Sequence, residues 1–227
     1  RPGFRLPGGW AAFEIAVRAI IGQQVSVAAA RTVTARLAQR FGTPLPAPPG
    51  PGLEHLFPEP GALADADLSA IGLTRARADT VRGIARALLD GRVDLRADRT
   101  LDDITARWTA LPGIGPWTAQ YIALRALGHP DAFPAEDLVL QKALPGDGSR
   151  LSARQLRLEA ERWRPWRGYA VIHLWREAMR PAATPAPSAT PASPPQARPA
   201  ASNIPAATTP RARRTGATRT RSPRKPA

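Results

Sequence analysis

The sequence predicts an all-α fold followed by a C-terminal tail that cannot form a core, and three observations support this. Apolar residues recur at helical spacing through residues 1–180, and no stretch alternates with period two for long enough to indicate a strand. The composition also changes abruptly after Arg180. We therefore divide the chain into a helical domain, 1–180, and a disordered basic tail, 181–227.

Local signals place the helices of the first domain. Apolar residues run at helical spacing from Trp10 to Ile21, and Ser26 can cap a second helix that ends at Phe41, before Gly42. A loop rich in proline and glycine, 44–60, follows. The remaining predicted helical segments are a short one within 63–73, then 76–89, 101–111, 117–127, 152–163 and 169–179.

The net charge of +14 is unevenly distributed. Residues 181–227 hold eleven prolines, eight of the 32 basic residues and none of the 18 acidic ones, which leaves 24 basic against 18 acidic residues, a net charge of +6, in 1–180. Such a tail buries too little apolar surface to offset its ordering entropy. We interpret it as a solvated segment, as an electrostatic tether to DNA, or as both. Because the chain begins with Arg1, we expect it to be a fragment of a longer protein.

Composition also excludes several classes of site. The chain has no cysteine, which excludes disulfides, thiolate zinc sites and a cysteine-ligated iron–sulfur cluster. His55, His129 and His173 are not at ligand spacing from one another, so we do not assign them to a metal. No run of 18 apolar residues and no signal peptide is visible, so we expect no membrane partner.

The most informative motif is Leu111-Pro112-Gly113-Ile114-Gly115, between two predicted helices. Glycines at alternate positions permit a tight turn and a close approach of the backbone to a surface. The free amide groups at the start of the next helix, together with its dipole, suit a phosphate. A phosphate contact of this kind positions a protein on DNA without selecting a base. The alternative interpretation is a tight turn between helices with no ligand.

Aromatic and acidic residues follow this hairpin. Trp117 and Tyr121 are four residues apart and share a helix face. Asp137 precedes an apolar run, where a carboxylate often serves only as a helix N-cap. Further along, Trp163-Arg164-Pro165-Trp166-Arg167 places aromatic rings beside arginines.

These segments together resemble the AlkA-type 3-methyladenine DNA glycosylase II group of the helix-hairpin-helix superfamily of base-excision glycosylases. Two earlier segments, 16–27 and 68–76, match the same group, and the resemblance extends from about Gly3 to Arg180. It implies a helix-hairpin-helix glycosylase fold of two helical subdomains with a cleft between them. It also implies a partner, double-stranded DNA with alkylated bases flipped out of the duplex.

The resemblance assigns the chemistry to Asp137, whose carboxylate would stabilise positive charge on the sugar and orient the attacking water. Glu136 and Asp131 are nearby rivals that match the family position less well. Related bifunctional enzymes carry a nucleophilic lysine where this chain has Trp117. An indole cannot form a Schiff base, so we predict a monofunctional hydrolase without lyase activity.

The resemblance further implies a base pocket of Trp117, Tyr121 and Trp166, with Trp163 and Trp175 as competitors of Trp166. Electron-rich rings suit the cationic base that alkylation of a purine produces.

Gln24 stands at the position where the best-known family member has a leucine, which acts as a wedge and fills the gap left by the flipped base. The alternative interpretation is that Gln24 only ends a helix.

Family members bind a monovalent cation through hairpin carbonyls, here those of Leu111 and Gly113, and need no other cofactor. We thus hypothesise a monomeric alkylpurine glycosylase of the bacterial cytoplasm, associated with the nucleoid through DNA. The alternatives are a non-catalytic DNA-binding module and an oxidised-purine glycosylase with lyase activity.

Overall fold

The computed structural model describes residues 3–145 and 147–180, and within these ranges the fold is helical. No strand forms there; extended backbone pairs only in an isolated bridge between Pro44 and His55. The all-α prediction is confirmed, whereas the predicted tail, 181–227, lies outside the described residues.

In chain order the elements are α1 (Ala12–Ile21), α2 (Val27–Phe41), α3 (Pro60–Leu63), the 3-10 helix η1 (Ser69–Ile71), α4 (Arg75–Leu89), α5 (Leu101–Thr109), α6 (Pro116–Arg125), α7 (Leu138–Ala143), α8 (Ala153–Ala160), the 3-10 helix η2 (Glu161–Trp163) and α9 (Arg167–Ala178).

Polar residues at the helix N-termini set several of these bounds. The hydroxyl of Ser26 accepts a hydrogen bond from Ala29 N at 3.2 Å, and α2 then runs from Val27 to Phe41 as predicted. Thr74 and Thr100 cap α4 and α5 in the same way. Ser152 forms a complete capping box, in which the side chain of the third helical residue bonds back to the cap.

Some predicted ends were wrong by one or two residues, and two short helices, α3 and α7, were not predicted. The first helix begins at Ala12 rather than Trp10, and the predicted segment 152–163 is divided between α8 and η2. The six-residue helix α7 was not predicted as an element, although Asp137 was considered as its cap. Six residues span fewer than two turns, which is too short for a periodic apolar pattern.

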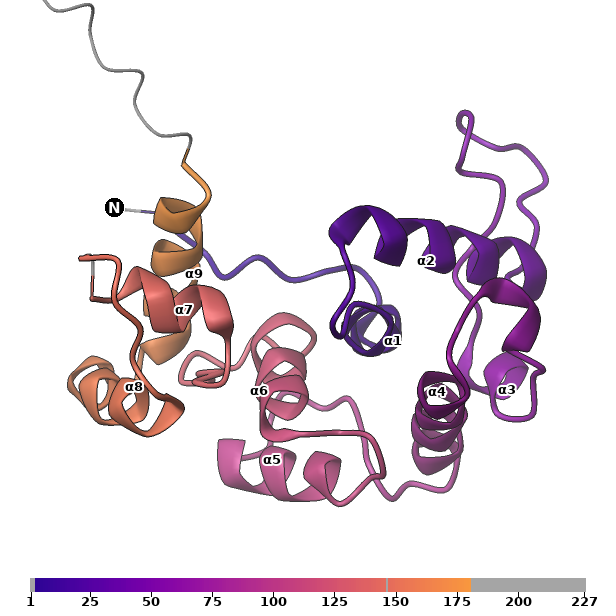
Figure 1. Ribbon diagram of the computed structural model, residues 1–227. Coiled ribbons are helices and arrows are strands. Elements are labelled where there is room, and N and C mark those ends of the chain that lie inside the picture. The colour runs from indigo at the N-terminus through magenta and orange to yellow at the C-terminus, as the bar shows by residue number, and fades with distance from the viewer. Residues whose placement is uncertain (1–2, 146, 181–227) are drawn as a thin grey trace, which may run out of the picture. The chain divides into compact units, whose positions relative to one another are not determined.

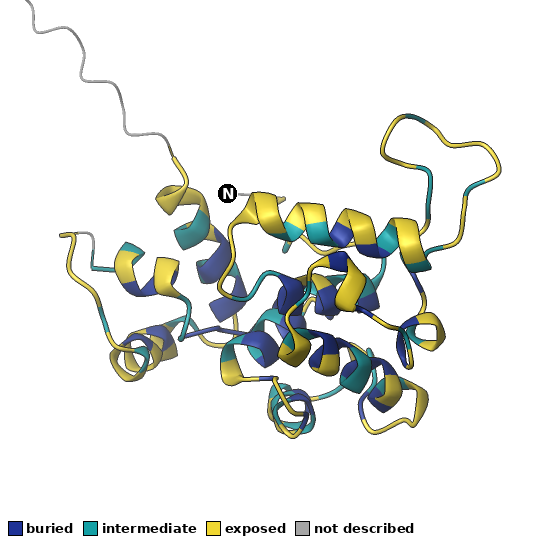
Figure 2. Ribbon diagram, turned by 45° about the vertical axis from the view of Figure 1, so that its right-hand side comes forward, coloured by how far each residue is buried: buried dark blue, intermediate teal, exposed yellow. Residues whose placement is uncertain are grey.

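Helices α1 and α6 pack against each other and form the centre of the core. Helix α1 also packs on α2 and α4, whereas α6 packs on α5, and α7 packs on α9. Figure 2 shows the buried residues gathered at the centre, while α2 buries only Thr34 and Leu37. None of the described helices is long and apolar enough to cross a membrane. Figure 1 places α1–α4 on one side of the α5–α6 hairpin and α7–α9 on the other.

The turn between α5 and α6 depends on one of its two glycines more than on the other. Gly113 has φ +84°, in the left-handed region, and a Cβ added there would lie 2.0 Å from Thr80 Oγ1. Gly115 caps α6 in an extended conformation, and a Cβ there would meet nothing within 4 Å. The conformational need expected for both glycines therefore applies to Gly113 alone.

Replacing Gly113 with alanine should lower the free energy of unfolding by about 1–3 kcal/mol, because the new methyl group overlaps the buried side chain of Thr80. Urea unfolding measures the change. Gly115→Ala is the matched control in the same turn and should cost clearly less. Equal losses in the two variants would show that neither the left-handed backbone nor the Thr80 contact constrains the hairpin.

Candidate active site

Asp137 is the N-cap of α7, and its carboxylate is held by four donors. The Oδ1 atom accepts hydrogen bonds from Val139 N and Leu140 N, both at 3.0 Å. It also accepts one from Trp175 Nε1 at 3.2 Å, and Oδ2 accepts one from Trp117 Nε1 at 3.0 Å. Because an ionised carboxylate only accepts hydrogen bonds, this arrangement suits a charged Asp137 of fixed orientation. The role of a helix cap and a role in chemistry are compatible here.

The two indoles that reach Asp137 belong to an aromatic cluster. Trp117 stacks on Tyr121 with ring centroids 5.0 Å apart and an interplanar angle of 26°. Trp175 completes the cluster, with its ring centroid 6.1 Å from that of Tyr121 and the two rings tilted by 46°. The i, i+4 spacing on α6 thus brings Trp117 and Tyr121 together as expected.

Trp166 lies elsewhere. It precedes α9, is 58% exposed, and packs edge-on against Tyr169 at 5.7 Å. Its competitor Trp163 packs on Phe133 instead. Among the described residues, the third aromatic side chain of the cluster beside Asp137 is therefore Trp175, which joins Trp117 and Tyr121. The family resemblance implied Trp166 for this position, with Trp163 and Trp175 as its competitors, whereas the structure brings Trp175 to Asp137.

The two rival carboxylates are engaged in ion pairs. Asp131 is buried and pairs with Arg167 and Arg164. Glu136 pairs with Arg157 and lies on the wall of the same cleft as Asp137. Glu136 therefore shares the location of Asp137 but has a cation as its partner, whereas Asp131 is not at the cleft.

Asp137 opens onto a cleft of about 640 Å³. Its lining comes from three places: the turn after α1, the first turn of α6, and the segment around the start of α7. The lining residues are Gly22, Gln23, Gln24, Val25, Gly115, Trp117, Thr118, Glu136, Asp137, Leu138 and Val139. The volume is in the range that small-molecule sites occupy. Residues distant in sequence thus meet at one concave surface, and both Gln24 and Asp137 line it.

Gln23, which the sequence analysis did not assign, fixes the turn that carries Gln24. Its side-chain amide donates to Thr118 Oγ1 at 3.0 Å and to the Gly113 carbonyl at 3.4 Å. Its own carbonyl accepts a hydrogen bond from the Arg77 guanidinium. Gln24 itself is exposed and has φ +55°, a left-handed conformation that is uncommon outside glycine. These contacts fix the backbone at Gln24, but they do not show what its side chain does.

The hairpin lies beside the cleft. Its carbonyls already have partners in part, since Leu111 O accepts from Ile114 N at 3.1 Å and Gly113 O accepts the long bond from Gln23. Helix α6 starts at Pro116 with no side-chain cap at Gly115, so its first amides lack the partner that a cap would supply. Leu111 and Ile114 are buried, while Pro112, Gly113 and Gly115 are exposed. The apolar residues therefore anchor the turn and the others form its surface.

His129 stands at the start of the segment that leads to Asp137. Burial lowers its pKa below the ordinary value near 6.5, although the nearby Asp131 carboxylate opposes the shift. The neutral ring fits its contact, because Nδ1 accepts a hydrogen bond from Asp131 N at 3.2 Å. A protonated ring could not accept this bond.

The free energy of unfolding should therefore fall as the pH decreases from about 7 to 5, since the unfolded state binds a proton at a higher pH than the folded state does. His129→Asn keeps a side-chain acceptor for Asp131 N but does not titrate. We expect its unfolding free energy, measured by urea at several pH values, to decline less over this window. Parallel curves for the two proteins would contradict the assignment.

Comparisons with known proteins agree with this geometry. A family model described as HhH-GPD superfamily base excision DNA repair protein matches residues 17–167. The chain is 42% identical over 179 residues to DNA-3-methyladenine glycosylase 2 of Escherichia coli, an alignment that covers 77% of this chain and 61% of that protein. It is 41% identical over 180 residues to a Mycobacterium tuberculosis protein named probable bifunctional transcriptional activator/DNA repair enzyme AlkA, with coverage of 79% and 36%.

Among solved structures, a 3-methyladenine DNA-glycosylase from Archaeoglobus fulgidus superimposes with a TM-score of 0.62 at 29% identity, covering 74% of this chain and 58% of that one. The chain spans less than two thirds of the length of each of these three proteins. The matched region contains the hairpin, Trp117, Tyr121 and Asp137, whereas Trp175 lies beyond it. The chain belongs to the HhH-GPD superfamily of base excision DNA repair proteins.

Proposed function

We propose that this chain is a monofunctional DNA glycosylase that hydrolyses the N-glycosidic bond of alkylated purines, of the 3-methyladenine and 7-methylguanine type, flipped out of duplex DNA. One observation carries the proposal: the Asp137 carboxylate, held by two indole and two backbone N–H groups, lies on an open cleft beside stacked aromatic rings. The names of the relatives in Escherichia coli and Archaeoglobus fulgidus support the same reaction.

In the proposed reaction the bond between the sugar and the base breaks heterolytically, and its electron pair leaves with the base. Positive charge then develops on the sugar, where the Asp137 carboxylate stabilises it electrostatically. The oxygen of a water molecule bonds to the anomeric carbon and loses a proton to solvent. Trp117, Tyr121 and Trp175 would contact the flipped base, whose positive charge favours aromatic faces.

The hairpin would hold the DNA while this happens. The exposed Gly113 and Gly115 permit a close approach of the backbone, and the uncapped start of α6 offers amide groups to a phosphate. A monovalent cation on the carbonyls of Leu111 and Gly113 remains part of the proposal. Gln24 would occupy the space left by the flipped nucleotide. The enzyme would act as a monomer.

Trp117 argues against a lyase. Its indole nitrogen is engaged with Asp137, and the only lysine of residues 1–180 is Lys142, which is exposed in the last turn of α7. Borohydride should therefore trap no covalent adduct with damaged DNA. A trapped adduct would instead support the bifunctional alternative.

The decisive experiment compares base release by wild type, Asp137→Asn and Glu136→Gln on duplex DNA containing 3-methyladenine or 7-methylguanine. Asp137→Asn removes the charge that stabilises the sugar and should slow release by about 10²-fold or more. Glu136→Gln is the matched control, because it neutralises the adjacent carboxylate of the same cleft. It should retain most of the activity. DNA binding without release by wild type would favour the non-catalytic module.

A further inference from the structure

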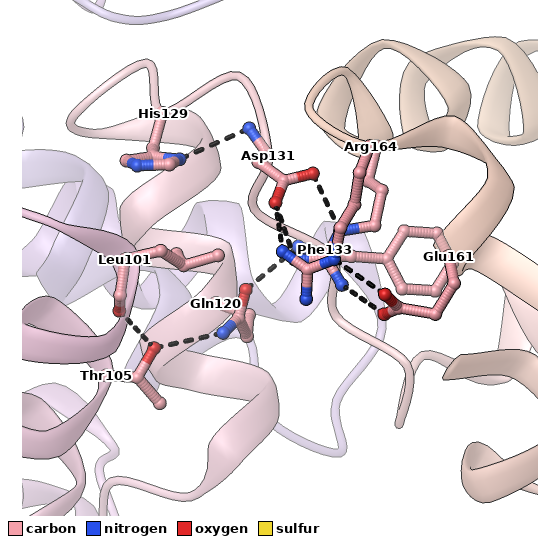
Figure 3. Close-up of polar contacts among 9 residues, drawn as sticks. Leu101, Thr105, Gln120, His129, Asp131, Phe133, Glu161 and Arg164 are labelled. Atoms are coloured by element: carbon pink, nitrogen blue, oxygen red, sulfur yellow. Dashed lines mark hydrogen bonds and ion pairs between the residues drawn. The ribbon is translucent and has the colours of Figure 1, made fainter. Parts of the chain in front are cut away.

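The segment that delivers Asp137 to the cleft is unusual in being a buried stretch without regular structure. All five residues from Asp131 to Ala135 are buried, and none lies in a helix. Buried backbone amide and carbonyl groups require hydrogen-bond partners, and a non-helical stretch supplies few of its own. Figure 3 shows side chains from other elements that supply them.

Two glutamines satisfy the backbone of this stretch. Gln120 of α6 accepts a hydrogen bond from Phe133 N at 2.8 Å, and its amide donates to Thr105 Oγ1 of α5 at 3.0 Å (Figure 3). Gln141 of α7 donates to Ala135 O at 2.9 Å. The stretch is therefore attached to α6 at Phe133 and to α7 at Ala135.

The first residue of the stretch is held by charge. The Arg167 guanidinium donates to both carboxylate oxygens of Asp131, through Nε at 2.7 Å and Nη2 at 2.8 Å. The two side chains are only 9% and 11% exposed. Arg164 adds a third bond to Asp131 at 2.6 Å, and Glu161 pairs with both arginines.

Backbone contacts fix the same end. Gly168 N donates to Pro130 O at 2.7 Å. A Cβ added to Gly168 would lie 2.8 Å from that oxygen and 2.8 Å from Leu124 Cδ1. The first turn of α9 is thus packed directly against the residue that precedes Asp131.

Helix α9 therefore holds the segment at both of its ends. Arg167 in its first turn bonds Asp131, and Trp175, eight residues later and about 12 Å along the axis, bonds Asp137. A displacement at Asp131 would change the path of the chain to Asp137 while Trp175 stays in place.

We propose that Arg167 is a positioning residue, which fixes the Asp137 carboxylate at the cleft through its bidentate bond to Asp131 and the buried stretch 131–135. Arg167 touches neither the base nor the sugar. The effect on catalysis rests on the proposed function, whereas the effect on the geometry of Asp137 does not.

Arg167→Lys tests the proposal, because lysine keeps the charge but cannot donate two bonds in one plane. We expect single-turnover base release to slow by about tenfold or more, since displacements near 1 Å can cost 10²-fold. Affinity for undamaged DNA should not change. In an Asp137→Asn background, Arg167→Lys should cause no further loss of the residual rate. Equal losses in both backgrounds would indicate a general structural role and overturn the proposal.

The matched control is Arg99→Lys. Arg99 donates two hydrogen bonds to Asp94, at 2.8 and 2.6 Å, in the loop before α5, with side chains 32% and 26% exposed. Both bonds end on one oxygen, Asp94 Oδ2, so this variant loses a two-bond contact between a guanidinium and a carboxylate in another part of the domain. It should release base at the wild-type rate.

If Arg167→Lys does not fold, Arg164→Gln tests the same idea with little risk to the core, because Arg164 is half exposed. It removes the third bond to Asp131, and we expect a smaller rate loss that also disappears in the Asp137→Asn background. A rate loss of equal size in both backgrounds would overturn the proposal.

A measurement that does not depend on catalysis separates the positioning role of Arg167 from the proposed glycosylase function. The six tryptophans give resolvable indole N–H signals in ¹H–¹⁵N spectra, and Trp117→Phe and Trp175→Phe assign the two that bond Asp137. Arg167→Lys should shift both signals, and Arg99→Lys neither. If wild type releases no base, the proposed function fails, and these shifts still decide the role of Arg167. Unshifted signals in folded Arg167→Lys would overturn it.

Discussion

The buried pair of Arg167 and Asp131 is the interaction on which the candidate site depends most. Breaking a buried ion pair costs about 3–5 kcal/mol, a large part of the 5–15 kcal/mol that stabilises a typical domain. A well-packed apolar pair of similar size would be about as stable, so stability alone does not explain the charges. What an apolar pair lacks is direction: a planar guanidinium that donates twice fixes the plane of the carboxylate as well as its position. A fixed orientation at Asp131 constrains the path of the chain to Asp137, six residues later, whose carboxylate must face the cleft.

The parts of the fold that could be predicted from sequence are those fixed by neighbouring residues. Ser26 and Gly42 define α2 to the residue, because a cap and a stop act within one turn. Asp137 could be proposed as a cap for the same reason. Helix α7 could not be predicted as an element, since Leu138 and Val139 are exposed and only Leu140 of its apolar residues is buried. Its position depends on α9, against which it packs, and no local pattern records that contact.

The candidate site shows the same division. Trp117 and Tyr121 could be paired because both belong to one helix. The choice among Trp163, Trp166 and Trp175 depends on which face of α9 meets α6 and α7, which is a tertiary property. Gln23 illustrates the limit further: its bonds to Gly113 and Thr118 join residues 90 and 95 positions apart. The family pattern singled out its neighbour Gln24 instead.

On the proposed function, the hydrogen bonds of Asp137 also bear on which bases can be released. A glycosylase that acts on an uncharged purine benefits from a general acid, which protonates the base as the bond breaks. Asp137 is surrounded by four N–H donors, so its oxygens act as acceptors and are poorly placed to give up a proton. An alkylated purine already carries the positive charge that protonation would supply, and it leaves as a neutral molecule. Besides Glu136, Asp137 is the carboxylate that lines the cleft, and it accepts hydrogen bonds. The site is thus suited to bases that need no proton. It selects them by their reactivity and also by the aromatic surface of Trp117, Tyr121 and Trp175.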